Sequence, residues 1–527
     1  GIDISWKRVN ANKSIIENLN RAKEEFDPNH PERIVKFLLI AYSEIDKIKD
    51  KHWAVIKKNE IKNLINFYKQ INNSLQLVLI NQIIKNGKGQ INIDLNFDDK
   101  GKIKSDYKLS GKIFNAEIQV QKNKNLKELN FNFTIKDKDY RFEKILFKFN
   151  KINLNSEFLN IQKKNKEFHV KGNLKNKKDK INSDLILLIF KDDLEIFDFS
   201  NTKFDSISEF TFSLSKKFKI KNLVIDSKFN LDEFILKYNS DKIKKYINSY
   251  NNLVNLKESK LHIKYSEEKV LVNGTSKFYI GENFDNLIRF QIENIKNKIN
   301  FETFLNLENI KLTFEDIAYK KTEKDKATLK IKGFKNNKKL FFENINYEED
   351  NNNIVINNLD IKSGKILDID QIKFDYLSEN NFKNQINLVK KSDDYELIGK
   401  SFDSIKLIEN ISDSEANANF FEIFENLNSK IKIKIDEVKL DEKNTVNNLI
   451  ASLEIKNSKI FDLNLNSNFS NSEKLFVSIK TQKDSSIVTT FHSDRAKPFV
   501  KKYKFIKGFE DGNLDFTSTK INNVSTS

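Results

Sequence analysis

The chain of 527 residues contains no cysteine and no methionine, and it has only three prolines. The absence of cysteine excludes disulfides, thiolate nucleophiles and cysteine-ligated metals. It is also compatible with an oxidising compartment such as the bacterial periplasm. Because proline cannot donate a hydrogen bond to a β-ladder, its scarcity leaves long strands uninterrupted.

Long apolar runs are missing as well. The longest, residues 34–42 and 185–190, fall far short of the ~20 residues that a membrane-spanning helix needs. No signal peptide is recognisable at the start of the chain. We interpret the chain as a fragment of a longer protein and expect a membrane anchor to precede Gly1.

Sequence motifs of catalysis and metal binding are absent too. None of the five histidines stands in an HExxH or His-x-His pattern, and no GxGxxG, P-loop or GxSxG motif occurs. The adjacent carboxylates Asp393 and Asp394 would point to opposite faces of a strand. We therefore expect no enzyme, no metal and no other cofactor. The isolated histidines are His30, His52, His169, His262 and His492.

The net charge of +17 has two interpretations. A basic surface would suit nucleic acid or an acidic membrane. However, the basic residues are mostly Lys, and Asn and Ile are abundant, which is typical of an AT-rich genome. Arg, the residue that reads bases through paired hydrogen bonds, is scarce. We favour the compositional interpretation and predict no nucleic-acid partner.

The hydrophobic pattern changes once along the chain. From Pro31 to about residue 85 the apolar residues recur with helical spacing, which predicts two or three helices that include Trp53 and Ile56. These helices would form a lid or membrane-surface segment, or a hairpin packed on the first strands, which we favour. Short helices are also expected near residues 241–256 and 416–427.

From Gly89 onward apolar and polar residues alternate, which predicts half-buried strands. The strands follow one another every 10–20 residues, as in a mostly antiparallel meander. The pattern divides the chain into a helix-rich segment (1–88), an elongated antiparallel β region (89–394) and a C-terminal β region (395–527). Such a sheet either packs against a second sheet as a dry sandwich or curls and leaves its apolar face accessible.

The alternation assigns a set of C-terminal residues to the apolar face. If the sheet stays open, these side chains would line a lipid groove; in a sandwich they would form an ordinary core. The candidates are Ile431, Ile433, Ile435, Leu453, Ile455, Leu463, Leu465, Leu475, Val477 and Ile479.

The segment SDRAKPFVKKYKFIKGFEDGNLDF, from Ser493 to Phe516, predicts a short helix between two strands. Ser493 or Asp494 is expected to cap the helix start, and glycines are expected to form the return turn. The expected apolar face of the helix consists of Ala496, Phe499, Val500 and Tyr503, and the glycines of the turn are Gly508 and Gly512.

This segment resembles the C-terminal region of AsmA-like proteins of proteobacteria, which opens with Ser-Asp-x-Ala and closes with Gly-Gly-x-Leu. A second stretch, LIGKSFDSIKLI at 397–408, is similar to the family's Gly-x-Ser-(apolar)-Asp segment, which leads into a helix. The resemblance covers roughly residues 395–520, and Asp511 replaces the first closing glycine. The matching positions are Ser401, Asp403, Ser493, Asp494, Ala496, Gly512 and Leu514.

The resemblance implies a mainly β fold, in which a long, curled, mostly antiparallel sheet forms an elongated apolar groove. The family is related to bridge-like lipid transfer proteins. It implies a periplasmic protein tethered to the inner membrane that takes part in phospholipid transport to the outer membrane and in outer-membrane biogenesis. Phospholipids are the expected partners, followed by envelope proteins. The alternative is an envelope scaffold with a dry β core.

Overall fold

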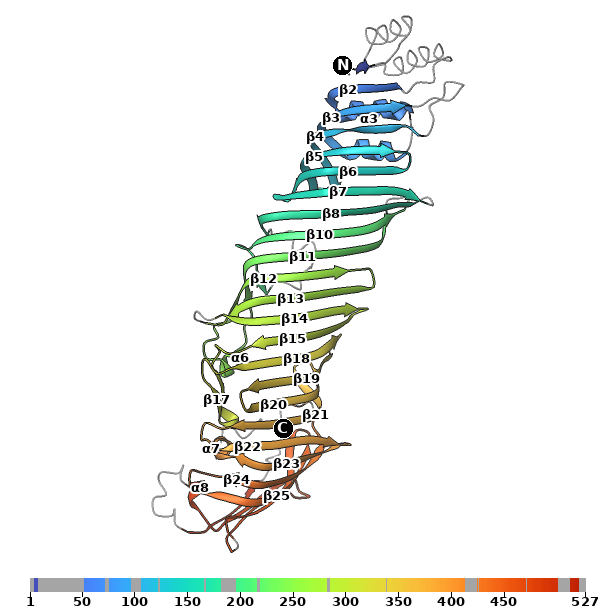
Figure 1. Cartoon of the computed structure of the whole chain (residues 1–527). Helices are drawn as coiled ribbons and strands as arrows, with labels where there is room; N and C mark the ends of the chain where they lie inside the picture. Colours follow the sequence, from blue (N-terminus) through green and yellow to red (C-terminus); the bar gives the residue numbers. More distant parts are fainter. Residues whose placement is uncertain are drawn as a thin grey trace, which may run out of the picture. The chain divides into compact units, whose positions relative to one another are not determined.

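The computed structural model (Figure 1) describes residues 4–7, 52–71, 75–95, 106–121, 124–164, 167–181, 196–215, 219–281, 285–337, 339–412, 424, 426–470, 472–500 and 512–520. The chain forms two compact units. Unit 1 consists of residues 1–234 and 258–270, and unit 2 of residues 235–257 and 271–527. The described part is mainly β, as the sequence predicts, and all of its strands except one short pair belong to one mixed sheet.

Unit 1 is an antiparallel ladder in which each strand pairs with the next along the chain from β1 to β8, and β8 then pairs with β10. Two helices connect β2 to β3. The elements are β1 (Ile4–Lys7), β2 (His52–Glu60), α3 (Ile61–Ile71), α4 (Leu75–Ile83), β3 (Ile84–Leu95), β4 (Lys108–Gln121), β5 (Lys124–Lys136), β6 (Asp139–Phe149), β7 (Ile152–Lys164), β8 (Glu167–Lys180), β9 (Phe197–Asp198) and β10 (Lys203–Leu214). Three further strands divide their residues between the units: β11 (Ile220–Lys237), β12 (Leu253–Tyr265) and β13 (Lys269–Tyr279).

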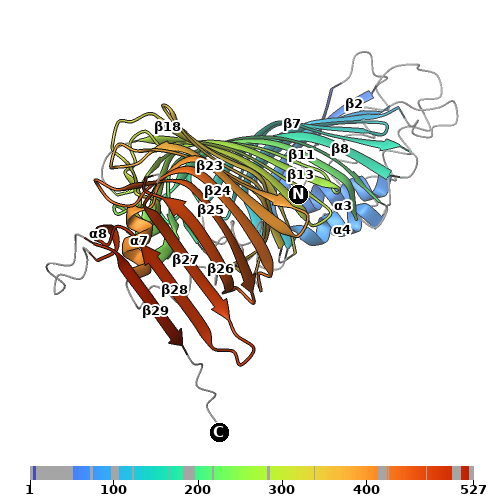
Figure 2. The same cartoon turned by 90° about the horizontal axis from the view of Figure 1, so that it is seen from below.

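The core of unit 1 forms where α3 packs on one face of the strands (Figure 2). The helix contributes Ile61 and Leu64, which are 6% and 2% exposed. The strands contribute Ile113, Ala116 and other apolar side chains of β4 to β6. A helix with an apolar stripe buries it most effectively against a one-faced sheet, which explains why this region is dry.

Bulges bend the strands beside this core. Asn115, Glu128 and Lys144 have φ angles of 49°, 53° and 52° on three successive strands. The pairing register shifts at these positions in β4 and β5. Each bulge precedes a buried core residue, as Asn115 precedes Ala116. Because a bulge bends its strand and increases the twist, the aligned bulges curve the sheet next to α3.

Unit 2 is a second ladder, antiparallel from β14 to β23 and from β24 to β29, with one parallel pair, β23 and β24. Figure 2 shows how its last strands curve. Its strands are β14 (Asn286–Ile295), β15 (Lys298–Asn306), β16 (Leu312–Phe314), β17 (Tyr319–Lys321), β18 (Ala327–Asn336), β19 (Lys339–Glu349), β20 (Asn352–Lys362), β21 (Lys365–Leu377), β22 (Lys383–Lys391), β23 (Asp394–Asp403), β24 (Ser429–Lys439), β25 (Thr445–Lys456), β26 (Lys459–Asn468), β27 (Lys474–Thr481), β28 (Ile487–Ser493) and β29 (Leu514–Lys520).

The helices of unit 2 are short and lie in connections between strands. A parallel pair needs a crossover connection, and α7 lies in the one that joins β23 to β24. The helices are α6 (Asp241–Tyr246), the 3-10 helix η2 (Glu315–Ile317), α7 (Ile405–Ser412) and α8 (Lys497–Val500). Among the described residues, no helix is long and apolar enough to cross a membrane.

The structure corrects part of the helical prediction. Trp53 and Ile56 belong to strand β2, so the helical interpretation of this stretch was wrong. Strand β2 has nine residues and is followed in the chain by two helices. In so short a stretch, the spacing of the apolar residues does not distinguish a strand from a helix. The helices at 61–71 and 75–83 are confirmed, whereas 31–51 lies outside the described residues. The helix near 241 is confirmed but ends at Tyr246, and most of 416–427 is not described.

Candidate functional site

One continuous line of side chains crosses unit 2 at right angles to its strands. We call it the central row, and it is defined by the directly paired positions of successive strands from β14 to β29. All of its members except Thr303 are apolar. They are Phe290, Thr303, Ile331, Ile345, Ile356, Ile372, Leu388, Leu397, Ile433, Ala451, Leu465, Val477, Phe491 and Phe516.

The central row is half-buried over most of its length. Ile356, Ile372 and Leu388 in its middle keep part of their surface exposed, and so do Ile433 and Leu465. At about 4.8 Å per strand, the row extends over roughly 60 Å of sheet. An apolar strip of this length and partial exposure is uncommon on a soluble domain and indicates an interaction surface.

The row is bordered on one side by the segment 307–326, which is inserted between β15 and β18. We call this segment the insertion. Tyr319 in this insertion is 1% exposed, and its ring packs edge-on against Tyr347 and Tyr376, with centroid distances of 6.0 and 5.5 Å. The Tyr319 hydroxyl bonds to Tyr347 at 2.6 Å and to the carboxylate of Glu349. Burial, first of all, raises the pKa of Tyr319 far above its ordinary value, so the phenol stays a neutral hydrogen-bond donor.

A buried lysine holds this insertion together. The Lys321 side chain is fully buried, and its Nζ donates to the backbone carbonyls of Glu308, Ile310 and Thr322 at 2.9, 3.0 and 2.8 Å. The Glu308 carbonyl also accepts from the backbone N–H of Lys324, so Lys321 ties three backbone carbonyls of the insertion together. Burial lowers the pKa of Lys321. The insertion is therefore a fixed border of the apolar face.

A second border lies where the chain approaches β24. Phe424 forms a parallel bridge with Ile366, and together with Leu427 it packs against the buried side chains of Ile369 and Tyr395. Burial, followed by the nearby Asp368 carboxylate, raises the pKa of Tyr395 to about 12. Both borders are thus dry, and the central row runs between them.

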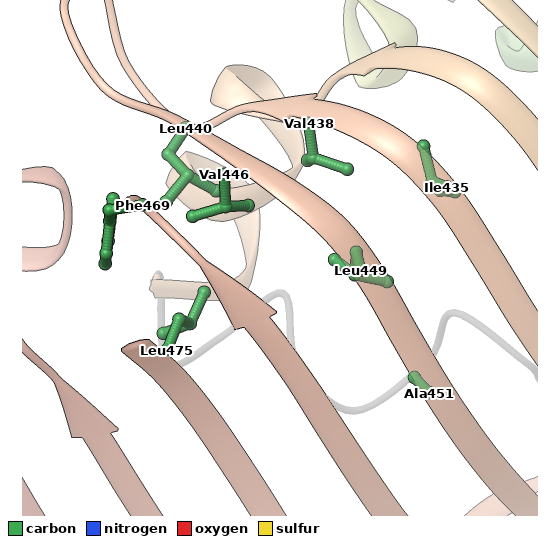
Figure 3. Packing of buried hydrophobic residues seen from close by; sticks show 8 residues of the cluster. All are labelled: Ile435, Val438, Leu440, Val446, Leu449, Ala451, Phe469 and Leu475. Carbon is green, nitrogen blue, oxygen red and sulfur yellow. The ribbon is translucent and has the colours of Figure 1, made fainter. Parts of the chain in front are cut away.

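The cluster at the C-terminal end of the face is more deeply buried (Figure 3). Ile435 and Leu449 face each other on β24 and β25, and Val446 is fully buried. Phe499 of α8 packs edge-on against Phe491 of the central row, with ring centroids 4.8 Å apart. Helix α8 therefore covers Phe491 near this end of the row, whereas Phe516, the last member, is 51% exposed.

The opposite face of the same strands is polar. A chain of side-chain amides runs from Asn344 through Asn357 and Gln371 to Asn387, with donor–acceptor distances of 2.8, 2.9 and 2.9 Å. Lysines such as Lys373 alternate with these amides. The sheet thus presents one apolar face and one mostly polar face, on which Val355 and Val389 pair with Lys373 and Gln371.

All ten groove candidates lie in the strands that the sequence predicts and on the apolar face. Ile433, Leu465 and Val477 are members of the central row, and the others form the rows on either side of it. Their exposure differs: Ile435, Leu453, Ile455 and Leu475 are buried, whereas Ile431, Ile433, Leu463, Leu465, Val477 and Ile479 are half-buried.

The sequence prediction missed the upstream half of the row, from Ile331 to Leu397. The same alternation was available there, for example in Ile354 and Ile356 of β20. What the sequence does not show is the register, because a one-residue shift moves every side chain to the other face.

The first motif residues have structural roles. The Ser401 hydroxyl donates to the carbonyl of Lys383 at 2.6 Å. Asp403 is 1% exposed, and its carboxylate accepts hydrogen bonds from Ser378 at 2.7 Å, Asn380 at 2.9 Å and the backbone N–H of Ile405 at 3.2 Å. The carboxylate thus fixes the passage from β23 into α7.

The second motif closes the excursion between β28 and β29. Ser493 pairs with Leu514 across the two strands, and the backbone N–H of Ala496 donates to the carbonyl of Gly512 at 2.7 Å. Ala496 is buried. The predicted strand–helix–strand order is confirmed in the described residues. Tyr503 and Gly508 lie outside them.

The predicted helix cap was wrong. Asp494 accepts a hydrogen bond from the backbone N–H of Lys474 on β27 at 2.7 Å. Ser493 bonds to Arg495, and α8 begins only at Lys497. Both side chains are used by the strand end and the turn, because the helix starts two to three residues later than the pattern indicates.

Among the described residues, no group of three or more His, Asp or Glu side chains is arranged to hold a metal ion. No protein-family model, no curated protein and no solved structure matches the chain. The family membership therefore stays a prediction based on the two motifs.

Proposed function

We propose that the apolar face of unit 2 binds the acyl chains of phospholipids and takes part in phospholipid movement between the inner and outer membranes of a bacterial envelope. The observation that supports this proposal is the central row, which is apolar across successive strands and only half-buried. A fully dry core would not leave Ile356, Ile372 and Leu388 partly exposed.

Binding on such a surface needs no polar recognition. Each methylene that leaves water contributes about 0.8 kcal/mol to the binding free energy. The affinity for an acyl chain therefore increases with the length of the chain. Neighbouring positions in the middle of the row are nearly equivalent, because Ile and Leu recur there from strand to strand. A chain can therefore shift from one position to the next with little change in free energy. The process requires no covalent chemistry and hence no catalytic residue.

The location is part of the proposal. An apolar face that carries phospholipid between two membranes belongs in the periplasm, tethered to the inner membrane, and the cysteine-free composition is compatible with that compartment. Roles in outer-membrane biogenesis and contacts with envelope proteins follow from the same placement. An envelope scaffold is the alternative, and the half-exposed row argues against its dry core.

The first test is organic extraction and mass spectrometry of protein purified without detergent. Phospholipid in stoichiometric amounts, at several molecules per chain, is the expected result. A lipid-free and stably folded protein would contradict the proposal and favour the scaffold.

A second test uses paired variants. Ile433→Asp and Leu465→Asp place a carboxylate on the central row, and Ile450→Asp places the same group on the polar face between them in the chain, where Ile450 is 58% exposed. We expect the first two variants to lose bound phospholipid while Ile450→Asp retains it. Circular dichroism must show that all three are folded. If the row variants unfold or keep their lipid, the open face is refuted.

A further inference from the structure

Helix α4 in unit 1 has an unusual surface. Its sequence, LQLVLINQI, contains no charged residue. The helix contacts α3, β3 and β4 on one side, yet Val78, Ile80 and Ile83 are 37%, 39% and 41% exposed. A surface helix normally turns its apolar side inward and its charged side to water. In α4 three of the exposed side chains are apolar, with the amide of Gln82 beside them.

The neighbouring helix behaves in the usual way, which makes the contrast specific. Ile61 and Leu64 of α3 are buried against the sheet, and Lys62 is exposed. The sequence-based preference for a hairpin packed on the first strands therefore holds for α3. It does not account for the outward side of α4.

The sequence around α4 is basic, although Glu117 of β4 interacts with Lys85 and Glu60 of β2 pairs with Lys88. Residues 61–88 contain no Asp and no Glu, although the chain has 75 acidic residues among its 527. The same segment contains four lysines, of which Lys62, Lys85 and Lys88 are exposed. An apolar helix surface flanked by lysines fits the boundary between anionic headgroups and acyl chains, where apolar burial and charge attraction add together.

We propose that α4 docks on an anionic phospholipid bilayer, with Val78, Ile80 and Ile83 entering the headgroup–acyl boundary and the flanking lysines contacting the headgroups. The interaction is interfacial, because nine residues are too few to span a membrane. It gives unit 1 a defined contact with a membrane surface. The inference does not depend on lipid binding by the central row.

The test is flotation of the purified chain with vesicles of phosphatidylglycerol and phosphatidylcholine. We expect binding to the mixed vesicles and weaker binding to phosphatidylcholine alone. The double variant Val78→Asp/Ile83→Asp should reduce binding about tenfold or more. Lys62→Gln/Lys85→Gln should remove the preference for anionic vesicles and retain the weak binding. The matched control, Ile207→Asp/Val224→Asp, changes residues of unit 1 that are 53% and 49% exposed and should bind as the parent chain does.

A second measurement uses the absence of cysteine. Ile80→Cys introduces a single thiol that takes an environment-sensitive dye, and Ile207→Cys serves as the control. The dye at position 80 should shift to the blue on addition of anionic vesicles, and the dye at 207 should not. Equal responses at both positions, or binding that survives the Val78→Asp/Ile83→Asp change, would refute the inference. A concentration-dependent dimer that the same change abolishes would assign the surface to a second copy of the chain instead. A protein that carries phospholipid but does not bind vesicles would refute α4 docking and leave the proposed function standing.

Discussion

The apolar faces of the two units are built from the same alternation but are completed differently. In unit 1, α3 places Ile61 and Leu64 on the strands and gives a dry core. In unit 2, the insertion and the segment at Phe424 cover the two sides of the apolar face. The central row between them, which includes Ile372, stays half-buried. The alternation of side chains along each strand thus gives the sheet one apolar face. Whether that face is covered depends on a helix or loop that packs on it.

The largest expected effect compares the two faces directly. Leu64→Ala should lower the free energy of unfolding of unit 1 by about 2–5 kcal/mol, because it leaves a cavity under α3. Ile372→Ala should cost unit 2 about 1–2 kcal/mol, since its side chain is already partly solvated. Urea titrations followed by tryptophan fluorescence report on unit 1, which contains Trp6 and Trp53, and hydrogen exchange reports on unit 2. Equal losses would mean that both faces are equally dry.

The second prediction concerns a feature that the units share. Gly111 lies under the ring of Phe133, and Gly333 lies under the ring of Phe301. An added Cβ would meet these rings at 2.8 and 3.0 Å, and it would lie closer still to the backbone carbonyl oxygen of Gln90 or Phe341 on the neighbouring strand. Such glycines let an aromatic ring of the neighbouring strand cover the backbone. Gly111→Ala and Gly333→Ala should each cost about 1–3 kcal/mol through overpacking. Gly512→Ala is the control, because nothing lies within 4 Å of its Cβ. Thermal midpoints measure all three, and an unchanged midpoint for the first two would contradict the close packing.

The third prediction tests whether the border of unit 2 is fixed by Lys321. Lys321→Met keeps most of the side-chain volume but removes the donor to three backbone carbonyls. The loss should be about 1–3 kcal/mol, since the carbonyls of Ile310 and Thr322 would lose this donor, whereas that of Glu308 keeps the backbone N–H of Lys324. Limited proteolysis of the segment 307–326 should become faster. Lys320→Met, at an exposed neighbouring position, should leave proteolysis unchanged.

The smallest expected effect lies at the last described strand of unit 2. His492 bonds to Asp515 on β29 at 2.7 Å and to Asp494 at 3.3 Å. The hydrogen bond to Asp515, above all, raises the pKa of His492 above its ordinary 6.5. A raised pKa in the folded chain means that the contribution to stability is complete below pH 6.5 and is lost as the pH rises through the folded-state pKa.

Hydrogen exchange of β29, corrected for the intrinsic rate, should therefore show more protection at pH 6 than at pH 8. His492→Gln should remove this difference. Equal protection of the parent chain at both pH values would show that the histidine does not stabilise the pairing of β28 with β29.

Much of the C-terminal fold could be predicted from the sequence. The alternation in Ile431, Ile433 and Ile435 identifies a strand with one apolar face, because the side-chain period of two is a property of the extended backbone. The helix after Asp403 was also predicted correctly. The stretch around Trp53 was not, since its assignment to β2 depends on pairing with β1 and β3.

The sequence by itself determined that the sheet has one apolar and one polar face, because the pattern of each strand is local. Only the tertiary structure decided that Leu397, Ile433 and Leu465 fall on one line, that Lys321 fixes a border, and that α3 closes the face in unit 1 while the middle of unit 2 stays half-exposed. The physical reason is that the strand register and the covering of the apolar face depend on contacts between segments far apart in the chain. The free energy of these contacts depends on which segments pair or pack together.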